Sequence, residues 1–163
     1  MKKYILDQQA VSRKLHRMAL EIIENNIEEQ ELILVGIRDH GSVIACEIQQ
    51  ILSSETRLNT SLIHLSLDKK NPGKIELSEE ISFTGKVVIV MDDVANSGKT
   101  MLYALQPILS GKPKMIQTLA LVERTHKAFP VNTDYVGLSL ATTVQDHIFV
   151  EVEGDVVTGA YIV

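Results

Sequence analysis

Short apolar runs separated by helical patterns constrain the fold of this 163-residue chain most strongly. Residues 32–37 (LILVGI) contain no polar side chain, residues 86–91 (KVVIVM) contain one, and residues 115–122 (MIQTLALV) contain two. Runs of this kind are typical of strands that are buried on both faces, which occur mainly in parallel sheets. The sequence therefore predicts an α/β domain with an open, mainly parallel twisted sheet flanked by helices.

The segments around these runs show helical periodicity. Asp7 is a suitable N-cap for a helix that is expected to run to about residue 26. Its apolar residues recur with helical spacing at Val11, Leu15, Met18 and Ile22. A second amphipathic helix is expected around residues 44–51 and a third at about 100–109. Pro107 is predicted to kink the third helix or to end its first part, and Gly111 to stop it.

The other segments predict strands and one surface excursion. Residues 60–67 (TSLIHLSL) predict a further strand, and short strands are expected near Tyr135 and at 148–152. Residues 68–82 are charged and contain Asn-Pro-Gly, which marks a turn, so they are predicted to form a hairpin or a flexible flap. The apolar tail GAYIV is expected to be buried at a sheet edge. No segment resembles a linker, so residues 1–163 are interpreted as a single domain.

Composition excludes several classes of protein. The single cysteine, Cys46, excludes an intrachain disulfide, and no metal-ligand spacing of histidines is present. No apolar run reaches the length of a membrane-spanning helix, and the N-terminus lacks the apolar region of a secretory signal. A cytoplasmic protein is the simplest interpretation. The net charge of −5 argues against a general nucleic-acid coat, although a local basic patch remains compatible with it.

One loop has the residues of a phosphate site. Residues 87–101 (VVIVMDDVANSGKTM) end like an ATP-binding P-loop. A P-loop has a glycine five positions before its last glycine, because its backbone wraps several phosphates. Counted back from Gly98, that position is Asp93, whose carboxylate would repel a polyphosphate. The P-loop interpretation therefore fails at a defining position.

The same residues suit a ribose 5-phosphate. The carboxylates of Asp92 and Asp93 are strong acceptors for the vicinal hydroxyls of a sugar. A tight turn of small residues leads into a helix near Thr100, where backbone N–H groups and the hydroxyls of Ser97 and Thr100 can bind one phosphate. The alternative is a turn whose aspartates only cap a helix. Residues 38–41 (RDHG) form a second polar loop after a buried strand, and ligands of such sheets bind at the carboxyl ends of strands.

With these residues in view, the sequence is similar to the type I phosphoribosyltransferases. VVIVMDDVANSGKT resembles their motif for binding phosphoribosyl diphosphate (PRPP), which has apolar residues, two acids and a small loop before a threonine. Over nearly the whole length the chain looks most like the PyrR family of pyrimidine-operon attenuators, which also carry uracil phosphoribosyltransferase activity. This resemblance includes ILDQQAVSRKLHRMALEIIENN, LILVGIRDHG and LALVERTHKAFPVNTDYVGLSL.

The resemblance implies transfer of phosphoribosyl from PRPP to a nucleobase, most simply uracil, with release of pyrophosphate. It implies Mg²⁺ held by PRPP and water near Asp92 and Asp93, with no direct protein ligand. Asp92, Asp93 and Arg38 are the expected catalytic residues, and the base is expected near Val122, Glu123 and Arg124. The expected PRPP-binding residues are Arg38, Asp39, His40, Gly41, Asp92, Asp93, Val94, Ala95, Asn96, Ser97, Gly98, Lys99 and Thr100.

Some positions depart from the family pattern. Purine salvage relatives have an aspartate that acts as a base where this chain has Asn96, so chemistry on six-oxopurines is disfavoured. The PyrR family usually has tyrosine there. Lys99 stands in place of a common arginine, which changes any bidentate contact. The segment 68–82 takes the place of the catalytic flap, is shorter than usual and has lysines but no arginine. These departures concern catalytic rate more than PRPP binding.

The sequence also contains two basic clusters, and it is compatible with two further functions. The resemblance places RNA contacts at Arg13, Arg17, His126 and Lys127, whereas ordinary solvated faces are the alternative interpretation of such short clusters. A regulator that binds PRPP or nucleotide and RNA with weak or no catalysis is the second hypothesis. A phospho-receiver domain is the third, although its paired acids usually lie early in a chain. A homodimer or larger homo-oligomer is expected from the family.

Overall fold

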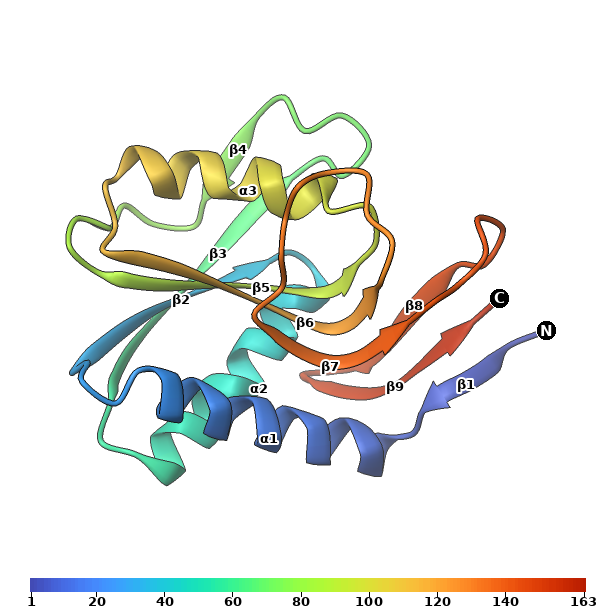
Figure 1. The fold of residues 1–163 in the computed structure, drawn as a ribbon. Helices are drawn as coiled ribbons and strands as arrows, with labels where there is room; N and C mark the ends of the chain where they lie inside the picture. Colours follow the sequence, from blue (N-terminus) through green and yellow to red (C-terminus); the bar gives the residue numbers. More distant parts are fainter.

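A six-stranded sheet in the order β4-β3-β2-β5-β6-β7 lies at the centre of the computed structural model, which describes all of residues 1–163 (Figure 1). The strands are β2 (Glu31–Ile37), β3 (Asn59–Leu67), β4 (Ile75–Leu77), β5 (Val87–Ala95), β6 (Met115–Arg124) and β7 (Tyr135–Leu140). All of them pair in parallel except β4, which runs antiparallel to β3. The predicted open, mainly parallel sheet is confirmed.

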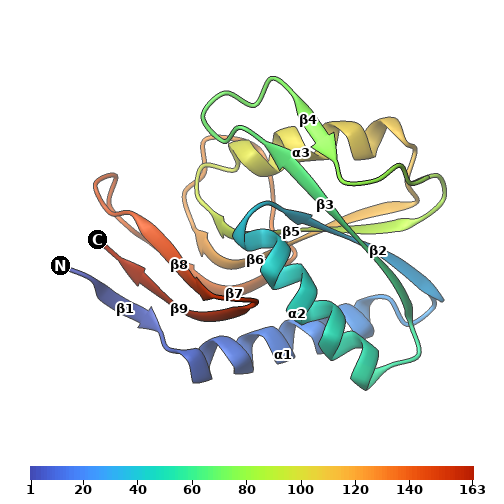
Figure 2. The same cartoon turned by 180° about the vertical axis from the view of Figure 1, so that it is seen from behind.

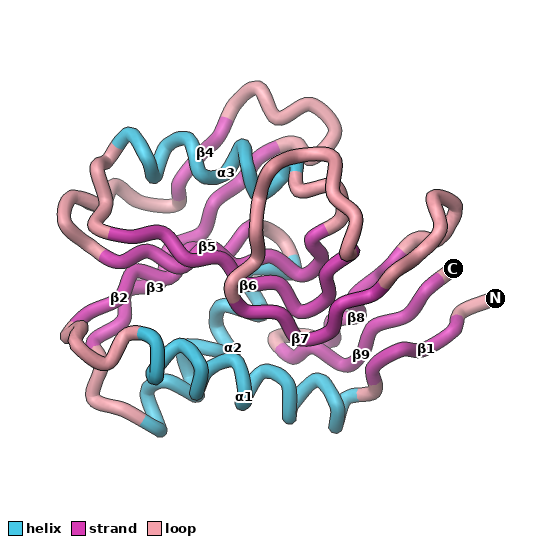
Figure 3. Tube along the Cα trace, viewed as in Figure 1, coloured by secondary structure: helices cyan, strands magenta, loops and turns pink.

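Helices cover both faces of this sheet (Figure 3). Helices α1 (Gln8–Asn25) and α2 (His40–Glu55) lie on one face, and α3 (Lys99–Ser110) lies on the other. Asp7 caps α1 as predicted, since its side chain accepts a hydrogen bond from the backbone N–H of Ala10 at 2.7 Å. Alternate side chains of β5 enter two separate cores, with Ile89 and Met91 facing α1 and α2, and Val88 and Val90 facing α3. The sheet is therefore buried on both faces, which explains its apolar strands.

A second, antiparallel sheet stands beside the first, in the order β1-β9-β8. Its strands are β1 (Lys3–Leu6), β8 (Ile148–Glu153) and β9 (Val156–Ile162), and the two termini lie side by side there (Figure 2). The predicted strand at 148–152 is confirmed. The apolar tail 159–163 was expected at a sheet edge, but it lies mostly in β9, the middle strand. Strand β1 was not predicted, because its four residues are too few to show the alternation of apolar and polar side chains that indicates a strand.

Two predicted boundaries were wrong. Strand β5 continues past the two aspartates to Ala95, because the long strand β6 supplies partners for Val94 and Ala95. Helix α2 begins at His40, so two residues of the expected loop belong to its first turn. The span of helix α3, expected at about 100–109, is confirmed as Lys99–Ser110, and Pro107 lies inside it without ending its first part. A proline removes one helical hydrogen bond, and the helix ends within one further turn, at the expected C-cap Gly111.

The segment 68–82 was predicted to form a hairpin or a flexible flap, and it forms a hairpin with β3. Its strand β4 pairs with β3, with Leu67 opposite Ile75 and Leu65 opposite Leu77. The connection at 68–74 leaves β3 at the same edge of the sheet as the loops after β2 and β5. None of the three helices is long and apolar enough to cross a membrane.

Candidate functional site

The loops after β2, β3 and β5 meet at the carboxyl edge of the main sheet. The chain passes from β2 to β3 on one side, and β5 lies on the other side of β2, so the strand order reverses between β2 and β5. Such a reversal opens a crevice for ligands in α/β sheets. Gly36 of β2 pairs with Met91 of β5. The polar residues that follow these two positions therefore lie at the same height along the edge of the sheet.

Asp92 and Asp93 form the centre of this edge. The side chain of Asp92 is 3% exposed and that of Asp93 15% exposed. Asp92 Oδ1 accepts a hydrogen bond from the backbone N–H of Asp93 at 2.9 Å, and Asp93 Oδ1 accepts one from that of Val94 at 2.8 Å. Two basic side chains face them, one from the connection after β3 and one from the first turn of α2. Lys69 Nζ lies 3.3 Å from Asp92 Oδ1, and His40 Nδ1 lies 3.4 Å from Asp93 Oδ2.

The two carboxyl groups differ in acidity although they are neighbours in the chain. Burial, together with the negative charge of Asp93, raises the pKa of Asp92, and the ammonium of Lys69 opposes this rise only in part. Burial also disfavours ionisation of Asp93, but the hydrogen bond from His40 and the charge of Lys69 outweigh it, so the pKa of Asp93 is lowered. Asp93 is thus the more acidic member of the pair, and Asp92 is the member that takes up a proton more readily.

Gly41 allows helix α2 to approach the acid pair. A Cβ atom at Gly41 would lie 2.7 Å from the carbonyl oxygen of Met91 and 3.0 Å from the Cα atom of Asp92, both of which are backbone atoms. Any larger residue would push the first turn of α2 away from β5. This close approach is what brings His40 to Asp93, so the glycine positions the charged partner.

The loop after β5 is a tight turn at the start of α3. Gly98 has φ of 85°, a left-handed conformation that favours glycine, and directly precedes the helix. The carbonyl oxygen of Ser97 accepts hydrogen bonds from the backbone N–H groups of Ala128 and Phe129, both at 3.0 Å, which fix the turn to the loop after β6. A hollow of about 60 Å³ lies in the turn, and it is lined by Lys69, Asp92, Val94, Ala95, Asn96, Ser97, Gly98, Lys99, Thr100 and Met101.

A second hollow, of about 340 Å³, adjoins the acid pair on the side of β2. It is lined by Arg38, Asp39, His40, Leu67, Asp68, Lys69 and Asp93. The peptide bond between Arg38 and Asp39 is cis. The guanidinium of Arg38 is exposed, and Lys69 also contributes positive charge, so this hollow suits an anion. All expected PRPP-binding residues except the buried Gly41 therefore line one of two adjoining hollows.

A third hollow, of about 460 Å³, lies beyond Asn96 and Ser97. Arg124 forms one wall, where its Nε donates to Asn96 Oδ1 at 3.1 Å and its other nitrogens donate to the carbonyl oxygens of Thr143 and Asp146. The remaining lining residues are His126, Ala128, Val144, His147, Ile148 and Phe149. Four of these, from 144 to 149, were not predicted, since the segment has no motif and reaches the site only through the fold.

The other two residues expected near the base have different surroundings. The side chain of Val122 is fully buried in the main core, so only its main chain is available to a ligand. Glu123 forms an ion pair with Lys127 and accepts a hydrogen bond from Ser139 at 3.2 Å. Of the three residues, only Arg124 lines the third hollow.

The four residues expected to contact RNA differ in their exposure and in their hydrogen-bond partners. Arg17 donates to the carbonyl oxygens of Val136 and Gly137 at 2.9 and 3.0 Å and pairs with Glu21. Lys127 is largely buried in its pair with Glu123. Arg13 and His126 are exposed and have no side-chain hydrogen bond. Arg17 and Lys127 thus have roles within the fold that the sequence did not indicate.

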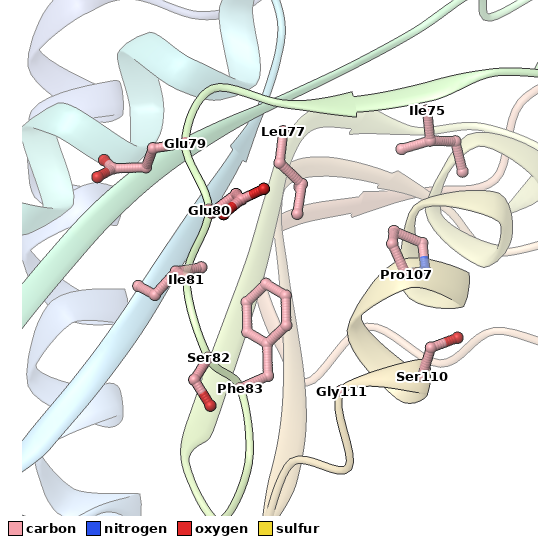
Figure 4. A pocket seen from close by; sticks show the side chains of 10 residues that line it. All are labelled: Ile75, Leu77, Glu79, Glu80, Ile81, Ser82, Phe83, Pro107, Ser110 and Gly111. Carbon is pink, nitrogen blue, oxygen red and sulfur yellow. The ribbon is translucent and has the colours of Figure 1, made fainter.

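The largest hollow lies away from the acid pair. It measures about 960 Å³ and is formed by β4, the segment after it and the end of α3 (Figure 4). Its charged residues are Glu79 and Glu80, and no cation lines it. A phosphorylated ligand would be repelled there, so size alone does not identify the site.

No group of three or more potential side-chain ligands for a metal ion is present. Asp92 and Asp93 are hard oxygen donors of the kind that Mg²⁺ prefers, but two carboxylates leave most of its coordination to be filled. A magnesium ion here would take most or all of its ligands from a bound phosphate compound and from water.

Comparison with known proteins agrees with this geometry. Residues 2–155 match the model of the phosphoribosyl transferase domain. The chain is 37% identical over 164 residues to the bifunctional protein PyrR of Clostridium acetobutylicum, covering 94% of this chain and 92% of that protein. It is 34% identical over 155 residues to a pyrimidine operon regulatory protein of Lactococcus lactis, covering 92% and 90%.

The fold also matches solved structures. The hypoxanthine-guanine phosphoribosyltransferase of Bacillus anthracis superposes with a TM-score of 0.72 at 22% identity, covering 86% of this chain and 84% of that one. At this identity the match concerns the fold alone. The family model and the relatives with more than 30% identity carry the assignment: this chain is a phosphoribosyltransferase and belongs to the type I phosphoribosyltransferase family, with PyrR proteins among its relatives.

Proposed function

We propose that this protein transfers the phosphoribosyl group of PRPP to uracil and releases pyrophosphate. The observation that carries the proposal is the order of three adjoining hollows around Asp92 and Asp93. The hollow in the turn 96–98 suits the 5-phosphate, the hollow beside Arg38 suits the pyrophosphate, and the hollow beside Arg124 suits the base. The acid pair between them suits the ribose hydroxyls.

Each part of the site has a separate task in this proposal. Backbone N–H groups at the start of α3 and the hydroxyls of Ser97 and Thr100 bind the 5-phosphate. Asp93, which stays ionised, accepts hydrogen bonds from the sugar. Arg38 and Lys69 face the leaving pyrophosphate, whose charge develops as its bond to the sugar breaks. Mg²⁺ bound to PRPP would supply further positive charge, and Asp92 and Asp93 are the residues that would hold it.

Uracil is favoured over a purine by two features. Asn96 stands where purine salvage relatives have an aspartate that acts as a base. The amide oxygen of Asn96 already accepts a hydrogen bond from Arg124. Relatives at 31–37% identity are named PyrR or pyrimidine operon regulatory protein, which also points to pyrimidines. Residues Arg124, His147 and Ile148 line the proposed base hollow.

A substrate panel tests the proposal. The protein is incubated with PRPP and Mg²⁺ and, in turn, with uracil, cytosine, hypoxanthine or guanine, and pyrophosphate release is measured. Uracil is expected to give release, with UMP as the product. Release with hypoxanthine in place of uracil would overturn the pyrimidine assignment.

A binding measurement tests the sugar assignment separately. Asp93→Asn removes the more acidic carboxylate of the pair and is expected to weaken PRPP binding by roughly tenfold or more, the range for hydrogen bonds to charged groups. Glu76→Gln, on the exposed strand β4, is the matched control and should leave the affinity unchanged. Equal affinity of Asp93→Asn and the unmodified protein in calorimetry would refute the ribose assignment.

A second candidate is a regulator that binds PRPP and RNA with little catalysis. It is favoured by a flap without arginine and by the Lactococcus lactis relative that is named a pyrimidine operon regulatory protein. PRPP binding without pyrophosphate release for any base would support it. A gel-shift titration with the leader RNA of the protein's own operon is then the direct test, and RNA affinity should fall steeply with salt.

A further inference from the structure

The acid pair is already occupied by donors of the protein itself. Three of its four carboxylate oxygens have a donor close by: Asp92 Oδ1, Asp93 Oδ1 and Asp93 Oδ2. Two of the donors are backbone N–H groups, which cannot leave without breaking β5. The other two are His40 and Lys69, whose side chains are both nearly half exposed.

Lys69 differs from His40 in how firmly it is held. His40 belongs to the first turn of α2, where Gly41 fixes the helix against the backbone of β5. Lys69 lies on the connection after β3 and reaches across the end of β2 to the acid pair, at 3.3 Å from Asp92 and 3.7 Å from Asp93. A long, flexible side chain on a connection is the donor that a ligand displaces most easily.

We propose that Lys69 is a placeholder for the sugar hydroxyls: it bridges Asp92 and Asp93 in the ligand-free protein and is displaced when a ribose 5-phosphate group binds. This inference rests on the proposed function, because it takes the acid pair as the sugar site. Sugar hydroxyls and an ammonium donate to the same carboxylate oxygens. Asp92 is only 3% exposed, and its Oδ1 atom, which Lys69 contacts, already accepts the backbone N–H of Asp93, so a sugar hydroxyl that binds this oxygen has to replace the ammonium.

The displacement connects the sugar site to the flap. Once the ammonium leaves the acid pair, the connection 68–74 loses its ion pairs to β5, and Lys69 becomes free to face the hollow beside Arg38. Lys69 is therefore a positioning residue, and the position of its side chain depends on whether the sugar is bound. The affinity for the sugar is set by competition with this internal cation.

The neighbouring lysines provide matched controls. Lys70 is exposed, and its side chain contacts no acid, although its backbone N–H bonds to Asp68 Oδ1 at 2.9 Å. Lys74 pairs with Glu76 at 3.0 Å on an exposed strand and lies outside the site. Both lysines belong to the same excursion as Lys69, so a general loosening of that segment would affect all three.

Amine labelling measures the displacement directly. The full chain is acetylated briefly, with and without saturating ribose 5-phosphate, and the modification of each lysine is quantified by mass spectrometry. Ribose 5-phosphate is the probe because it lacks the pyrophosphate that would engage Lys69 again. Labelling of Lys69 is expected to rise roughly fivefold on binding, the factor that corresponds to an ion pair of about 1 kcal/mol. Lys70 and Lys74 should change little.

An Asp92→Asn variant provides the second arm. In this protein Lys69 loses its main partner, so its labelling should be high without ligand and should not rise further with ligand. Binding of ribose 5-phosphate is followed by calorimetry in parallel. Binding that leaves Lys69 labelling unchanged, or reduces it, overturns the placeholder alone. Absence of binding by both ribose 5-phosphate and PRPP overturns the proposed function, and the placeholder with it.

Discussion

Asn96 and Arg124 join the phosphate turn to the wall of the proposed base hollow, with Arg124 Nε donating to Asn96 Oδ1 at 3.1 Å. The same guanidinium donates to the carbonyl oxygens of Thr143 and Asp146, in the segment before β8. One side chain thus holds three segments that are far apart in the sequence. The residue that departs most clearly from the family pattern, Asn96, is also the acceptor that this arrangement requires.

Arg124→Ala should therefore impair use of the base more than binding of PRPP. Without the guanidinium, the segment 143–146 loses its hydrogen bonds to β6, and the wall of the hollow is no longer fixed. We expect the KM for the base to rise by roughly tenfold, as for the loss of one charged hydrogen bond, while the Kd for PRPP stays the same. Steady-state kinetics and calorimetry separate the two quantities. Thr125→Ala, an exposed neighbour, is the control, and equal effects of both variants would contradict the prediction.

Gly41→Ala should damage the site through the backbone. The added methyl group would meet the carbonyl oxygen of Met91 at 2.7 Å, and neither backbone segment can yield without moving α2 from β5. We expect a loss of about 1–3 kcal/mol in the free energy of unfolding, as for other overpacked sites, and weaker PRPP binding.

Denaturant unfolding and calorimetry measure the two effects of this substitution. Gly73→Ala is the matched control, because a Cβ atom at Gly73 would meet nothing within 4 Å. Unfolding and PRPP binding that are unchanged in Gly41→Ala would show that the two elements do not approach as closely as described.

The His40–Asp93 contact predicts a specific dependence on pH. The hydrogen bond to Asp93 raises the pKa of His40 above its ordinary value, although burial opposes the rise. Because the folded pKa is the higher one, this contact stabilises the protein fully below the unfolded pKa of about 6.5. The contribution is lost as the pH rises through the raised folded pKa.

NMR titration of the His40 ring in the ligand-free protein checks this directly. The midpoint should lie above the ordinary histidine value of about 6.5, and it should fall in Asp93→Asn, where the partner has no charge. A His40 midpoint at or below about 6.5 would mean that the contact is absent in solution.

The sequence predicted the sheet and the position of the acid pair well, because both depend on local patterns. The strands at 32–37 and 86–91 are apolar throughout, since both faces are covered, and their polar ends mark the ligand edge. The sequence could not show that Lys69 reaches Asp92, because 23 positions separate them and the contact depends on β3 lying beside β2. The wall formed by His147 and Ile148 was missed for the same reason: it belongs to a second sheet whose first strand has only four residues.

The roles of basic residues were the least predictable, and Arg17 provides a clear test. Its guanidinium donates to two carbonyl oxygens of β7 and pairs with Glu21, so it fastens α1 to the edge of the main sheet. Arg13, one turn earlier on the same helix, is exposed and has no side-chain partner. Arg17→Ala should therefore lower the free energy of unfolding by about 1 kcal/mol, a value reduced for solvent exposure, whereas Arg13→Ala should leave it unchanged.

The same pair of variants separates a structural role from RNA binding. If α1 contacts RNA phosphates, Arg13→Ala should weaken binding to the leader RNA and reduce its salt dependence without affecting stability. If RNA affinity falls only in Arg17→Ala, and in proportion to its loss of stability, the basic face of α1 serves the fold alone. Denaturant unfolding and gel-shift titrations at two salt concentrations, carried out on both variants, distinguish these outcomes.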